Sequence, residues 1–139
     1  MATFQVVDEF ANFLGKKRDD LSADTIKAAL CLTAPTKAGT QVLADVTQIA
    51  ATGGYAVVTL SSVTWAETGA GTGIWQFSSA AFSWTASGAD FASARYVVIY
   101  DDTSTNKDVI GFLDYGASFT VTNGNSLTVT PGANGIFRM

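Results

Sequence analysis

The residues best suited to chemistry are aspartates that follow an apolar run. Residues 95–100 are apolar on both alternating faces apart from Arg95, a pattern that predicts a central, buried strand. Asp101 and Asp102 come directly after this run, and Asp108 ends the polar loop that follows. Such carboxylates could hold metal ions for phosphoryl transfer, bind one calcium ion, or turn the loop by accepting hydrogen bonds from its own backbone. We expect the last role, and we name Asp101, Asp102 and Asp108 as the calcium candidates, although their spacing does not match an EF-hand.

The composition removes most enzyme classes. The 139 residues include no histidine and a single cysteine, Cys31, which excludes a Ser-His-Asp triad, a Cys-His pair and a cysteine-rich zinc site. The formal net charge is −4, and the one basic cluster, residues 16–18, is followed at once by Asp19 and Asp20. We interpret this cluster as a solvated helix end. We therefore expect no enzymatic activity, no cofactor, no nucleic-acid partner and, without a run of about 18 apolar residues, no membrane partner.

Two other motifs could bind ligands. The glycine-rich stretch at residues 68–73 lacks the Lys-Ser/Thr that completes a P-loop, so we expect an exposed loop tip. Large aromatic residues could form a stacking platform for sugars or bases, but a β domain of this size also needs them in its core. We expect most of them in the core, with contacts between subunits as the next possibility and a binding platform as the last. The residues in question are Trp65, Trp75, Phe77, Phe82, Trp84, Tyr96 and Tyr100.

The elements that must position these residues are mainly strands. Apolar spacing predicts one short amphipathic helix at residues 6–15. An alternating pattern predicts a strand within residues 24–33, although the alanines there leave a helix as an alternative. From Tyr55 onward, seven short β-branched and aromatic runs are bounded by turn residues. We expect one domain, residues 1–139, folded as an antiparallel β-sandwich or barrel of about seven to nine short strands. Residues 1–20 would be its helical N-terminal segment, which could contact a partner.

The last two runs allow a prediction of register. A three-residue loop, Asn123 to Asn125, would place Val121 opposite Leu127 and Phe119 opposite Val129, which puts the apolar residues on one face. A two-residue loop would scatter them over both faces. We therefore predict a hairpin between these two runs with the odd-length loop.

Seven segments together resemble small virion structural proteins of tailed bacteriophages: VVDEF, DTIKAALCLT, ADVTQIAATGGY, FSWTASG, ARYVVIYDDT, IGFLDYG and NGIF. The resemblance covers nearly the whole chain. It implies a capsid decoration, or cement, protein that is made in the cytoplasm of the bacterial host and stabilises the capsid surface of the virion. The implied partners are the major capsid protein and, by analogy with other cement proteins, two further copies of the chain in a homotrimer. None of these motifs implies a catalytic residue.

Two alternatives remain beside the capsid expectation. The chain could be a tail or fibre component of a virion, or a carbohydrate-binding module that uses its three tryptophans and calcium. In any of these roles the apolar side of the N-terminal segment is an interface candidate, through Phe4, Phe10, Phe13 and Leu14. Deleting residues 1–15 would show whether the helix is an anchor for a partner or a part of the core. A folded product that no longer binds would indicate an anchor, whereas loss of folding would place the helix in the core.

Overall fold

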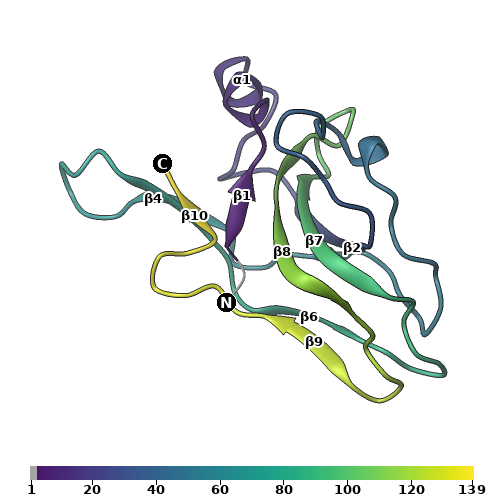
Figure 1. Ribbon diagram of the computed structural model, residues 1–139. Helices are drawn as coiled ribbons and strands as arrows, with labels where there is room; N and C mark the ends of the chain where they lie inside the picture. Colours follow the sequence, from purple (N-terminus) through teal and green to yellow (C-terminus); the bar gives the residue numbers. More distant parts are fainter. Residues whose placement is uncertain (1–2) are drawn as a thin grey trace.

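The run of residues 95–100 lies in β7 (Ala94–Asp101), the central strand of a five-stranded antiparallel sheet (Figure 1). This computed structural model describes residues 3–139. Every residue of β7 except Arg95 is buried, which confirms the prediction of a central strand. The order β1-β8-β7-β2-β3 joins β1 (Phe4–Val6), β8 (Val109–Phe119), β7, β2 (Ile26–Cys31) and β3 (Val58–Thr59).

Five further strands form two smaller antiparallel sheets. One contains β10 (Phe137–Arg138), β5 (Trp75–Ser78) and β4 (Thr64–Glu67) in that order, and the other pairs β6 (Phe82–Thr85) with β9 (Ser126–Val129). The helical elements are α1 (Phe10–Gly15) and a single 3-10 turn, η1 (Leu43–Asp45). Within residues 3–139 the strands form open sheets and no closed barrel. The prediction of a mainly β, antiparallel fold with one short helix is confirmed.

The N-terminal segment differs from its prediction because its first described residues form a strand. Phe4 lies opposite Leu113, Val6 lies opposite Gly111, and the backbone N–H of Val7 donates to the Ile110 carbonyl at 3.1 Å. Pairing with β8 in an extended conformation satisfies the backbone hydrogen bonds of these residues, and the helix therefore begins only at Phe10. Residues 1 and 2 of the predicted helical segment lie outside the described residues.

The predicted C-terminal hairpin is wrong. β9 pairs with β6 instead, and Leu127 lies opposite Trp84 while Val129 lies opposite Phe82. β8 continues through Gly116 to Phe119, which pairs with Ala94 of β7. The chain does turn after Thr122, whose carbonyl accepts the Asn125 N–H at 2.9 Å. The local pattern identified the apolar face of β9, but the partner strand follows from burial of Trp84 and Phe82 far away in the sequence.

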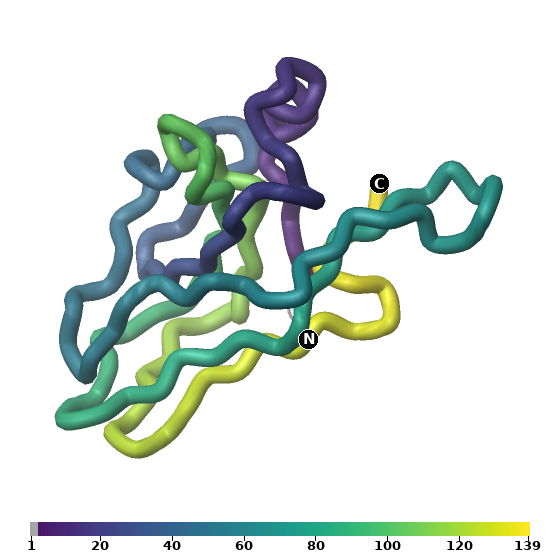
Figure 2. The backbone as a smooth tube through the Cα atoms, turned by 180° about the vertical axis from the view of Figure 1, so that it is seen from behind, coloured from purple at the N-terminus to yellow at the C-terminus, as the bar shows by residue number. Residues whose placement is uncertain are grey.

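One contiguous core joins the sheets. Buried side chains of β2, β7 and β8 pack with Phe82 and Trp84 of β6 and with Phe77 of β5. The hairpin of β4 and β5, together with β10, extends away from the rest of the molecule, and its tip is clear of the other elements in both backbone views (Figures 1 and 2). We call this three-stranded sheet the arm. Within residues 3–139 no helix is long and apolar enough to cross a bilayer.

Candidate functional site

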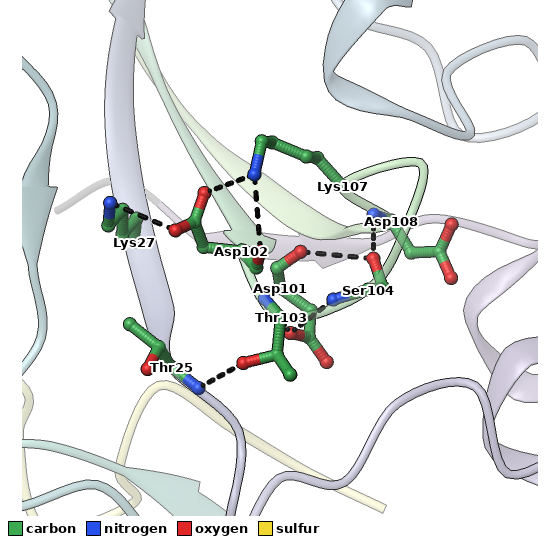
Figure 3. Close-up of polar contacts among 8 residues, drawn as sticks. All are labelled: Thr25, Lys27, Asp101, Asp102, Thr103, Ser104, Lys107 and Asp108. Carbon is green, nitrogen blue, oxygen red and sulfur yellow. Dashed lines mark hydrogen bonds and ion pairs between the residues drawn. The ribbon is translucent and has the colours of Figure 1, made fainter.

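The turn between β7 and β8 is organised by Asp101, whose side chain is fully buried. Its Oδ1 accepts the backbone N–H groups of Thr103 at 2.8 Å and Ser104 at 3.2 Å (Figure 3). The Ser104 hydroxyl donates to the Asp101 carbonyl at 3.0 Å and accepts the Asp108 N–H at 2.7 Å. A carboxylate at a strand end thus supplies acceptors that the turn needs. The structural role predicted for Asp101 is confirmed.

The adjacent Asp102 has different partners, since successive side chains of a strand point to opposite faces. Its carboxylate pairs with Lys107 Nζ at 2.7 Å and with Lys27 Nζ at 2.9 Å (Figure 3). Lys107 Nζ also donates to the Asp102 carbonyl at 3.2 Å. Hydrogen bonds from Lys107 and Lys27 hold the pKa of Asp102 below its usual value. Asp102 is therefore satisfied by two cations.

Asp108 has a partner that the sequence analysis missed. Arg18 Nη2 donates to Asp108 Oδ1 at 2.5 Å, across 90 positions of sequence, and the Arg18 guanidinium lies 4.3 Å from the centre of the Phe13 ring. Asp19, the next residue, is only 5% exposed. Arg18 is therefore not merely a solvated helix-end cation. Arg18 stands in a run of charged residues, between Lys17 and Asp19, and this run gave no local signal of the contact with Asp108.

The carboxyl groups of Asp19, Asp101 and Asp108 are buried side by side with too few donors. Asp19 lies within hydrogen-bonding reach of both others, yet both of its oxygens and one oxygen each of Asp101 and Asp108 have no donor. Burial, followed by the charges of Asp108 and Asp101, raises the pKa of Asp19 to about 8. Burial, followed by a hydrogen bond with Asp24, raises the pKa of Asp101 to about 7.

The structure does not bring all three calcium candidates together. Asp102 is bound to two lysines instead of facing Asp101 and Asp108. Among residues 3–139, no three acidic, cysteine or histidine side chains have an arrangement that could hold a metal ion. The buried trio of Asp19, Asp101 and Asp108 is accordingly a cluster of carboxyl groups in close contact, and we refer to it as the aspartate cluster.

The three tryptophans do not form one platform for sugars. Trp84 is buried, as expected of a core residue, whereas Trp65 and Trp75 stack on each other with ring centres 5.9 Å apart. Each of the two therefore covers part of the other's face. In the glycine-rich loop of the arm, the Glu67 carboxylate accepts the Gly73 N–H at 2.7 Å. This acid occupies the amides that an anion would need, which agrees with an ordinary loop tip.

The arm presents large apolar side chains that the rest of the chain does not cover. Trp75 is 42% exposed and pairs through its backbone with Met139, which is 49% exposed, and Ile74 precedes Trp75. We call Ile74, Trp75 and Met139 the arm patch. At the base of the arm, the Phe137 ring stacks with Phe4 at 5.6 Å between ring centres, so the arm is fastened to β1. The sequence analysis grouped Trp75 with the core candidates and missed the patch.

The interface candidates of the N-terminal segment lie in different surroundings. Phe10 and Phe13 are buried inside the chain, and their burial needs no partner to explain it. Phe4 and Leu14 are partly buried against the core. Phe4 also lines a groove of about 420 Å³ with Leu113, Tyr115 and the segment from Thr128 to Ile136. Only Phe4 and Leu14 thus keep surface that a partner could contact.

Comparison with known proteins returned no matching family model, no matching curated protein and no matching solved structure.

Proposed function

We propose that the chain is a non-enzymatic structural protein of a phage virion, a decoration protein that binds the major capsid protein on the outer surface of the head and assembles there as a homotrimer. The observation that carries this proposal is the arm. An extended three-stranded sheet with three large apolar side chains exposed is suited to reach a neighbouring subunit, because an exposed apolar patch on a soluble domain commonly marks a protein contact.

The chemistry of the arm patch supports a protein partner. Aromatic residues and methionine are enriched in the buried centres of protein interfaces, where few charges must lose their water. Trp75 and Met139 are paired through their backbones, and Ile74, also exposed, precedes Trp75 in the chain. A small contact of this kind is weak alone. Repeated over every copy on a capsid lattice, it would gain strength through avidity.

The direct test uses heads of the phage that encodes the chain, purified from a mutant lacking the gene. The wild-type protein and an Ile74→Ser/Trp75→Ser variant would be mixed with these heads, and bound protein measured by co-sedimentation. We expect at least tenfold weaker binding of the variant. Leu32→Ser is the matched control, since Leu32 is 47% exposed and lies outside the arm. Its binding should equal that of the wild type.

Circular dichroism of each variant would confirm that the fold is retained. Equal binding by the arm variant and the wild type would remove the arm from the contact. Binding of the wild type to purified tails, and not to heads, would reject the capsid location and favour the tail alternative.

A further inference from the structure

The aspartate cluster has an excess of buried acceptors. Three carboxyl groups from two parts of the chain meet there, and four of their oxygens have no donor. An ionised carboxylate only accepts hydrogen bonds, so three ionised groups could not satisfy one another. Leaving buried acceptors without donors is costly, and burying like charges together adds to that cost. At least one of the three groups must therefore become a donor.

The positions of the three groups identify the donor. Asp108 Oδ1 pairs with Arg18, and Asp101 Oδ1 accepts two backbone N–H groups, so each of these carboxyl groups already has a donor on one oxygen. Among the three, Asp19 alone has no donor on either oxygen, and its carboxyl interacts with both of the others. A proton on Asp19 gives one O–H that can be donated to Asp101 or Asp108.

We propose that Asp19 is protonated in the folded protein near neutral pH and that its proton closes a pH-sensitive latch between the segment following α1 and the β7–β8 turn. The two parts are already joined by backbone contacts. The Asp102 N–H donates to the Thr25 carbonyl at 2.8 Å, and the Thr25 N–H donates to the Thr103 hydroxyl at 2.8 Å. Loss of the Asp19 proton would set like charges against each other at this junction.

Charged residues from several parts of the chain lie around Asp19. The segment after α1 contributes Arg18, which is engaged with Asp108, and Asp24, which contacts Asp101. β7 contributes Asp101, and the residue before β8 contributes Asp108. On the other side of the turn, Lys27 and Lys107 both pair with Asp102, which leaves one positive charge in excess there. Arg18 is thus the one cation bound to the cluster among the ion pairs of residues 3–139.

The direction of the pH effect follows from proton counting. In the unfolded chain Asp19 ionises near its ordinary pKa of about 4, whereas the folded protein retains the proton until about pH 8. Between these values the folded state holds more protons, so stability falls as pH rises and levels off once the folded group has ionised. Asp101, whose pKa burial raises to about 7, contributes in the same direction, whereas the chain has no histidine and burial raises the pKa of Cys31 to about 11.

The first experiment is urea unfolding of the wild type and of Asp19→Asn at pH values from 5 to 9. The asparagine amide donates without titrating, so the variant should lose the part of the pH dependence that Asp19 contributes and keep the part that Asp101 contributes. Between pH 5 and 7 the unfolding constant of the wild type should rise relative to the variant by up to about tenfold per pH unit, the limit for one proton. Asp8→Asn, an exposed aspartate whose replacement changes the chain charge equally, is the control and should keep the wild-type slope.

A second measurement does not depend on the variant folding. The ¹³C shift of the Asp19 carboxyl in the wild-type protein should titrate near pH 8, and the amides of residues 102–109 should exchange faster above that pH after correction for intrinsic rates. Titration of Asp19 near pH 4, or equal slopes for the wild type and a folded Asp19→Asn variant, would overturn the proposal.

Discussion

Asp101 and Asp102 are neighbours in the chain and have opposite electrostatic environments. Alternation along β7 buries Asp101 beneath the turn and directs Asp102 to two lysines. The pKa of Asp101 is raised to about 7, chiefly by burial, while the pKa of Asp102 is lowered, chiefly by hydrogen bonds from Lys107 and Lys27. A residue type alone therefore says little about its role at this strand end. The position within the strand pattern decides it.

The acceptor on Asp101 can be tested by comparing two replacements. Asp101→Ala leaves the N–H groups of Thr103 and Ser104 without their acceptor, whereas Asp101→Asn retains a carbonyl oxygen. We expect the alanine variant to be less stable than the asparagine variant by about 1–3 kcal/mol, the cost of buried donors left unpaired. Urea unfolding at pH 6 measures the difference. Equal stability of the two variants would show that the turn does not need this acceptor.

The sequence predicted the roles of some residues of the site and not of others. The turn-forming role of Asp101 followed from its residue type and its place after an apolar run. Arg18 and Asp19 could not be assigned to the cluster, because they meet Asp108 only when segments about 90 positions apart come together. Local charge patterns cannot report such a contact.

The strand β1 packs so closely against β8 at Gly111 that only a glycine fits there. A Cβ atom at Gly111 would lie 2.6 Å from ring atoms of Phe4. Real Cβ contacts of that length do not occur, so a side chain here would push β1 away from β8 or move the Phe4 ring. β1 lies in the N-terminal segment that the sequence analysis described as helical, although the predicted helix, residues 6–15, includes only Val6 of this strand. Apolar spacing did not distinguish the two states for so short a segment.

Replacing Gly111 by alanine should disturb the packing of β1 against β8. We expect a loss of about 1–3 kcal/mol in stability, as for other overpacked interiors, with faster hydrogen exchange at the β1–β8 amides. Gly132→Ala is the control, since a Cβ there meets nothing within 4 Å and the backbone is not left-handed. Unchanged exchange in Gly111→Ala would contradict the close packing of β1.

The N-terminal segment as a whole should be needed for folding. Deleting residues 1–15 removes β1 and α1, including Phe10, which is fully buried. We expect the truncated chain to lose its cooperative thermal transition by circular dichroism, because truncating one buried phenylalanine alone costs about 3–5 kcal/mol. A truncated chain that still unfolds cooperatively near the wild-type temperature would return this segment to the role of a detachable anchor.

In the molecule as a whole, the sequence predicted the fold class better than the connections between strands. Alternation and turn residues indicated a mainly β chain, and the central position of β7 followed from burial on both faces. The pairing of β9 with β6, and the separation of β4, β5 and β10 into an arm, depend on contacts far apart in sequence. In the proposed function the arm matters most, since its patch supplies the surface that we propose for contact with a neighbouring capsid subunit.

The most direct measurement of the central claim is immunogold electron microscopy of virions from the phage that produces this chain, with antibody raised against the purified protein. Gold particles would be counted over heads, tails and background, and virions lacking the gene would serve as the control. The proposal predicts regular labelling over the heads that disappears in the mutant. Labelling confined to the tail, or no labelling above background on intact virions, would contradict a decoration protein on the capsid surface.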